Sequence, residues 1–169
     1  MNDALQFIED FEAHYQYDAG FMKEMVQHAP NAYDHFQQFL PMARHREQLP
    51  LEVYWIAKLA AMMVEDCGAC LQLNVRMARE QEVGIGLIQS ALAGGKQLPE
   101  HLQAVFHYAQ QVAGQGNVDA DLMQQIQNRY SRGQLLEMGL CIASAKVFPT
   151  IKRAIDEKPS CALIKVEVQ

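Results

Sequence analysis

The chain has 169 residues, with 14 lysine and arginine residues against 20 aspartate and glutamate residues and a formal net charge of −6. Half of the residues are hydrophobic and a fifth are charged, which is typical of a folded protein rather than a disordered chain. The acidic balance argues against broad binding to a nucleic-acid backbone, because such binding needs a basic surface. No apolar run reaches the ~20 residues of a membrane-spanning helix. We therefore expect neither nucleic-acid nor membrane partners.

The N-terminal segment differs from a signal peptide. Asp3, Glu9 and Asp10 stand where a signal peptide carries basic residues and then an apolar stretch. We therefore expect a soluble, cytoplasmic protein. Its length predicts one domain over residues 1–169, which is large enough to bury a core without a metal or disulfides.

Apolar residues recur at intervals of three or four almost throughout the chain, which predicts an all-α fold. Leu5, Ile8, Phe11 and Tyr15 follow this spacing and predict a first helix. Further helices are expected over approximately residues 21–26, 30–40, 50–64, 67–78, 87–92, 99–109, 121–126 and 131–157. The end of the chain, residues 164–168, alternates in a strand-like pattern, which is also compatible with a flexible terminus that docks on a neighbour.

Individual residues predict where several of these helices begin and end. Asp66 is expected to cap a helix that begins at Cys67, and Ser131 to cap the last long helix. Gly94-Gly95 is expected to end a helix in the left-handed conformation. Pro149 falls inside the last helix, where we expect a kink.

The pair Cys67 and Cys70 is the clearest chemical feature. Two intervening residues place both thiols on one helix face, close enough to join after small adjustments. Unpaired N–H groups at a helix start favour the thiolate, which attacks in disulfide exchange. The neighbouring Glu65 and Asp66 oppose a thiolate by their charge, although either could shuttle a proton. The spacing predicts a redox pair in a reducing compartment.

Three other interpretations of the pair stay open. It could be half of a zinc site completed by Cys141 and Cys161 or by histidines, although the chain has no second close cysteine pair. It could also be two buried thiols that act as small apolar groups, or a structural disulfide, which a cytosolic location disfavours. The histidines are scattered without metal-ligand spacing, so we expect no metal and no cofactor. We expect Cys141 to be a core thiol and Cys161 a tail thiol.

The order of these features resembles the AhpD-like branch of the carboxymuconolactone decarboxylase family over approximately residues 30–158. The residues that carry the resemblance are Leu49-Pro50, the helix 57–63, the pair Cys67 and Cys70, Ala78, Gly84, the helix to Gly94, Leu98-Pro99-Glu100, Tyr108-Ala109 and the helix from Glu137 through Ile142-Ala143 to Ala154. The resemblance implies an AhpD-like helical domain, here with a helical N-terminal extension. It also implies assembly into dimers, trimers or hexamers.

The chemistry that the resemblance implies is a peroxidase or disulfide reductase with Cys67 and Cys70 as catalytic residues. The substrate would be a hydroperoxide or a disulfide, and a partner dithiol protein would return the pair to its reduced state. The resemblance favours Cys70 as the thiol that meets the peroxide, whereas the helix-start argument favours Cys67. The sequence leaves this choice open.

The resemblance also implies a proton relay that this chain lacks. The redox members carry a glutamate twelve residues before the first cysteine and a histidine four residues after the second, and Trp55 and Asn74 stand there. Asn74 forms hydrogen bonds but carries no proton at neutral pH. Candidate replacements are Glu52, Glu65, Asp66 and Glu137. Two alternative functions therefore stay open: a helical oligomeric binding protein without peroxidase activity, or a carboxymuconolactone decarboxylase-like enzyme.

Overall fold

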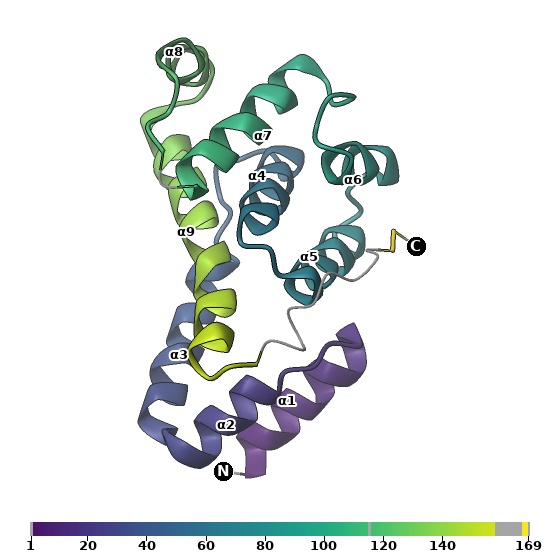
Figure 1. The fold of residues 1–169 in the computed structure, drawn as a ribbon, viewed down its shortest axis with the longest axis vertical. Helices are drawn as coiled ribbons and strands as arrows, with labels where there is room; N and C mark the ends of the chain where they lie inside the picture. Colours follow the sequence, from purple (N-terminus) through teal and green to yellow (C-terminus); the bar gives the residue numbers. More distant parts are fainter. Residues whose placement is uncertain (1, 115, 158–166, 169) are drawn as a thin grey trace.

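The computed structural model describes residues 2–114, 116–157 and 167–168, and these form nine α-helices and no strand (Figure 1). The helices are α1 (Asn2–Tyr15), α2 (Gly20–His28), α3 (Pro30–Ala43), α4 (Leu51–Val64), α5 (Gly68–Glu80), α6 (Ile85–Leu92), α7 (Glu100–Ala113), α8 (Ala120–Arg129) and α9 (Arg132–Ala154). The predicted all-α fold is confirmed. Among these described residues, no helix is both long and apolar enough to cross a membrane.

Helix α4 lies at the centre of the larger hydrophobic core and packs against α5, α6, α7 and α9 (Figure 1). Every residue from Val53 to Met62 is buried, as expected for a helix that is apolar around almost its whole circumference. Lys58 is the one charged residue in this buried stretch, with 4% of its surface exposed. A buried lysine has a large desolvation cost, which makes this side chain a feature that requires an explanation.

The N-terminal helices α1 and α2 form a second hydrophobic cluster with α3 and the C-terminal part of α9. Ile8, Phe21 and Phe36 are buried in it, and the rings of Phe36 and Phe148 lie 5.8 Å apart between centroids. Leu73 of α5 packs against the same cluster. The N-terminal extension therefore contacts the helix that follows the cysteine pair.

Several predicted helix boundaries are confirmed by their capping geometry. Ser131 forms a capping box with Gln134 at the start of α9. Gly94 and Gly95 adopt φ angles of 90° and 79°, the left-handed conformation that glycine accepts without strain. Pro149 lies inside α9, which continues to Ala154, and the expected kink there stays a prediction.

One capping prediction is wrong. Cys67, not Asp66, is the N-cap residue of α5, and no side chain caps this helix. Asp66 instead has a φ angle of 51° in the connection between α4 and α5. That short connection needs a left-handed residue, a conformation that aspartate tolerates better than most side chains, so Asp66 serves the turn instead of the helix start.

The end of the chain returns to α5. The side-chain amide of Gln72 accepts a hydrogen bond from the backbone N–H of Glu167 at 2.7 Å and donates one to its carbonyl at 2.9 Å. Val168 packs against the larger core. The other residues of the predicted strand-like tail lie outside the described residues, so that prediction is not tested.

Candidate redox site

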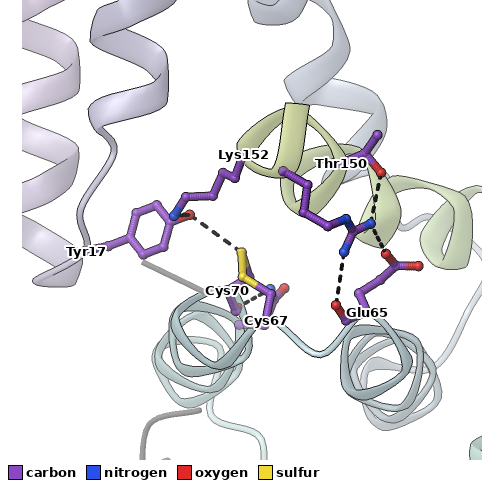
Figure 2. Close-up of a disulfide and its surroundings, with 8 residues drawn as sticks. Tyr17, Glu65, Cys67, Cys70, Thr150 and Lys152 are labelled. Atoms are coloured by element: carbon purple, nitrogen blue, oxygen red, sulfur yellow. Dashed lines mark hydrogen bonds and ion pairs between the residues drawn. A yellow bond between two sulfur atoms is a disulfide. The ribbon is translucent and has the colours of Figure 1, made fainter. Parts of the chain in front are cut away.

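Cys67 and Cys70 form a disulfide at the N-terminus of α5 (Figure 2). Their Cα atoms lie 5.3 Å apart, because Cys67 is the N-cap residue and Cys70 belongs to the first helical turn. Both residues are buried, each with 2% of its surface exposed. The structure therefore brings together the two site residues predicted from the sequence, in an arrangement compatible with redox chemistry.

A chain of contacts connects the disulfide to the buried side chains of Tyr17 and Lys152. The Tyr17 hydroxyl lies 3.7 Å from Cys70 Sγ, and either atom can donate the hydrogen bond. Lys152 Nζ donates to the same hydroxyl at 3.1 Å and lies 4.7 Å from the centre of the Tyr17 ring. Figure 2 shows these side chains meeting beside the sulfur, Tyr17 from the α1–α2 connection and Lys152 from α9. Lys152 is fully buried. One hydroxyl thus links a cysteine sulfur to a buried amine.

Sequence reasoning missed both residues. Tyr17 lies in the N-terminal extension, outside the range of the family resemblance, and it is separated from Cys70 by 53 positions. Lys152 is 135 positions from Tyr17 and looks in the sequence like a basic residue in the last turn of a helix. No local pattern connects residues at these separations, so only packing of the helices reveals them.

The carboxylates that the sequence offers as relay residues lie in different surroundings. Glu65 forms ion pairs with Arg153 at 2.7 Å and with Lys146 at 3.8 Å. Glu52 and Asp66 are exposed. A phenol and an amine, those of Tyr17 and Lys152, lie beside the disulfide.

Glu137 holds the connection between α3 and α4 in place through hydrogen bonds to its backbone. Its buried carboxylate accepts backbone N–H bonds from Glu47 at 2.7 Å, Gln48 at 2.9 Å and Leu49 at 3.3 Å. Burial acts to raise the pKa of Glu137, but these N–H donors outweigh it and the pKa is lowered. The charged form of Glu137 therefore stabilises the folded chain.

We predict that Glu137→Gln lowers the free energy of unfolding by about 2 kcal/mol at neutral pH, because the charge-assisted hydrogen bonds are lost. The pKa of Glu137 is lower in the folded state than in the unfolded state. The stabilisation by its charged form is therefore complete above the usual pKa of 4.5, and it is lost as the pH falls through the pKa of the folded state. Urea titrations over a pH series would measure it. The exposed Glu52→Gln is the control, and an equal loss in both variants would contradict the prediction.

A cavity of about 340 Å³ lies beside Cys70, within the usual range of ligand pockets. Cys70 lines the cavity, and Cys67 is not among the described residues that line it. Most of the lining is apolar or aromatic: Phe7, Phe11, Tyr15, Tyr17, Phe21, Met22, Leu40, Tyr54, Met62, Leu73, Met77 and Phe148 among others. Of the two cysteines, Cys70 is therefore the one that the structure places at the wall of this cavity.

Trp55 and Asn74 both line this cavity. Trp55 donates its indole N–H to the side-chain oxygen of Gln81 at 3.1 Å. Asn74 donates to the backbone carbonyl of Cys70 at 2.8 Å. These positions therefore belong to the site, although neither side chain transfers protons at neutral pH.

Cys141 is a core thiol, as predicted. It donates a hydrogen bond to the Tyr54 carbonyl at 3.4 Å, and burial raises the pKa of Cys141 to about 11. Cys161 lies outside the described residues. In the part of the chain that the structure describes, no three His, Cys, Asp or Glu side chains are grouped so as to hold a metal ion.

Neither a family model, a curated protein nor a solved structure matches this chain. The function is therefore inferred from the geometry and chemistry of the site.

Proposed function

We propose that the protein is a thiol–disulfide oxidoreductase of AhpD-like type that reduces hydroperoxides through Cys67 and Cys70. The observation that carries this proposal is that Cys70, one half of the disulfide, lines an apolar cavity of ligand size. A disulfide that only braces the fold does not need such a cavity. A redox disulfide needs a sulfur that the substrate reaches, and the cavity provides this access to an otherwise buried atom.

The reaction begins with both cysteines reduced. The Cys70 thiolate attacks the terminal oxygen of the hydroperoxide, the O–O bond breaks, and Cys70 becomes a sulfenic acid as an alkoxide leaves. The Cys67 thiol then attacks the Cys70 sulfur and expels water, which forms the observed pairing. One hydroperoxide is thereby reduced to an alcohol and water while two thiols are oxidised. A partner dithiol would return the pair to its reduced state.

The local structure supports both the thiolate and the proton transfer in this scheme. Cys70 lies in the first turn of α5, where unpaired backbone N–H groups and the helix dipole stabilise a thiolate. The alkoxide needs a proton, and the Tyr17 hydroxyl lies 3.7 Å from Cys70 Sγ, where it can donate one. The amine of Lys152 would stabilise the phenolate that remains until solvent reprotonates it.

The test is a titration of the fully reduced protein with cumene hydroperoxide, in the absence of oxygen. We expect one equivalent of cumyl alcohol for each pair of thiols lost, with mass spectrometry placing the new disulfide between Cys67 and Cys70. Cys141 is the internal control, because its buried thiol has a raised pKa and resists oxidation. If the pair and Cys141 are oxidised equally slowly, the proposed reaction is wrong.

We also propose that the protein forms a homo-oligomer. Leu136 and Leu140, one turn apart on α9, have 61% and 39% of their surface exposed, and the exposed Ala143 continues the same helix face. A second copy of the chain would cover this apolar strip.

Light scattering of the wild-type protein at micromolar concentration is expected to give a mass above one chain. Leu136→Asp should shift the protein toward monomer, because a charge would enter the covered strip. The matched control is Ile155→Asp, which places a charge at an apolar residue that is 47% exposed beyond the strip. A wild-type monomer would contradict this proposal.

A further inference from the structure

We propose that the cavity beside Cys70 binds a monocarboxylic acid with an aliphatic chain, and that Lys58 holds its carboxylate. This inference goes beyond the proposed redox reaction, because such binding depends on neither cysteine. It explains why a lysine lies in the buried centre of α4.

Lys58 has hydrogen-bonding capacity left for a ligand. Its ammonium donates to the Ala43 carbonyl at 3.1 Å and to the Ser144 hydroxyl at 2.5 Å. The Ser144 hydroxyl donates its own hydrogen bond to the Cys141 carbonyl at 2.8 Å. Since an ammonium has three N–H donors, these described acceptors use two and leave one. Lys58 and Ala43 both line the cavity, so this donor group lies at its wall.

Lys58 also needs a negative charge. Among the described residues, no carboxylate forms an ion pair with it. Burial lowers the pKa of Lys58, because desolvation disfavours its charged form. A ligand carboxylate would supply the missing counter-charge and accept the remaining N–H bond. Such a charge-assisted bond is stronger in a buried site than at the surface.

The charged side chains around the cavity favour an anion as well. Arg44 and Arg46 line it together with Lys58, and Glu80 is the one acidic residue in the described lining. Glu80 is already engaged, because it accepts hydrogen bonds from Tyr15 at 2.5 Å and from His14 at 2.9 Å. Three basic groups against one occupied carboxylate leave a positive excess near the cavity.

The other side chains that line the cavity favour a ligand whose main part is apolar. Phe7, Phe11 and Phe21 come from the N-terminal helices, and Leu40 and Phe148 come from α3 and α9. These side chains offer no hydrogen bonds, so a small hydrophilic anion would gain nothing from them. A molecule with a carboxylate at one end and an aliphatic chain at the other matches both parts of the cavity.

The chain contains a built-in reporter for this site. Trp55 is its only tryptophan and lines the cavity, so fluorescence titrations observe binding there directly. We expect decanoate to bind at least about tenfold more tightly than decanol, which has the same chain length but no charge. Equal affinities for the two probes, or no response of Trp55 to decanoate, would overturn the proposal without any variant.

Lys58→Met tests the anchor itself. Decanoate affinity should fall by about tenfold to a hundredfold, while decanol affinity stays nearly the same. Lys96→Met removes an exposed lysine outside the cavity and should change neither affinity. An equal loss for both probes in Lys58→Met would overturn the assignment of Lys58.

Two further measurements keep the result interpretable. Lys58→Met removes bonds to Ala43 and Ser144, so its helical content is checked by circular dichroism before titration. If the variant does not fold, the NMR signal of the wild-type Lys58 side chain replaces it, and an unchanged signal on addition of decanoate would overturn the proposal. The titration measures binding and not peroxide reduction, so failure of this proposal and failure of the proposed redox reaction are distinguished.

Discussion

Cys70→Ser is expected to lower the rate of hydroperoxide reduction by about 10³-fold or more, because it removes the nucleophile that the cavity exposes to substrate. Cys67→Ser should behave differently. The first attack at Cys70 still occurs in that variant, but no second thiol is present to expel water, so the protein stops at the sulfenic acid of Cys70.

The measurement is a single-turnover reaction with cumene hydroperoxide, followed by trapping of sulfenic acid with dimedone. Only Cys67→Ser is expected to give a trapped adduct, at Cys70. Cys141→Ser is the matched control, because that buried thiol has no part in the scheme, and it should keep the wild-type rate. An adduct at Cys67 in Cys70→Ser, at an undiminished rate, would reverse the roles of the two cysteines.

Tyr17→Phe should lower the same rate by about 10²-fold, at the lower end of what general acid catalysis contributes. The change removes one oxygen and keeps the ring, so the packing against Phe11, at 6.1 Å between ring centroids, is preserved. What is lost is the hydroxyl between Cys70 Sγ and the amine of Lys152. The alkoxide then leaves without a proton.

The choice of substrate separates this chemical role from a structural one. A peroxyacid releases a carboxylate, which needs no proton at neutral pH, so Tyr17→Phe should affect its reduction far less than that of cumene hydroperoxide. Tyr33→Phe is the control, because the Tyr33 hydroxyl accepts a hydrogen bond from Gln37 and Tyr33 is not among the residues that line the cavity. Equal losses with both oxidants would contradict proton donation by Tyr17.

The role of the N-terminal extension changes with the structure. The resemblance covered approximately residues 30–158, which left the first two helices outside it. These helices supply Phe7, Phe11 and Phe21 to the cavity wall, and their connection supplies Tyr17. Asn74, on α5, donates a hydrogen bond to the Cys70 carbonyl. The extension brings the hydroxyl that lies beside the sulfur.

Local features of this protein were predictable from the sequence alone. The helical periodicity, the cap at Ser131, the left-handed Gly94-Gly95 and the closeness of Cys67 and Cys70 depend on residues a few positions apart. Backbone geometry links such neighbours whatever the rest of the chain does. The one local error, at Asp66, arose because the turn from α4 to α5 competed with the helix start for the same residue.

Tertiary structure alone decided how the site is assembled. It placed Cys70 in the wall of the cavity, brought Tyr17 and Lys152 to the sulfur of Cys70, and enclosed Lys58 among apolar helices. Tyr17 and Lys152 are 135 positions apart, and no spacing rule relates residues at that distance. Their meeting depends on the packing of two hydrophobic clusters, which places side chains from many helices at one point. The sequence determined the helices and the cysteine pair, whereas the packing of those helices decided what surrounds the pair.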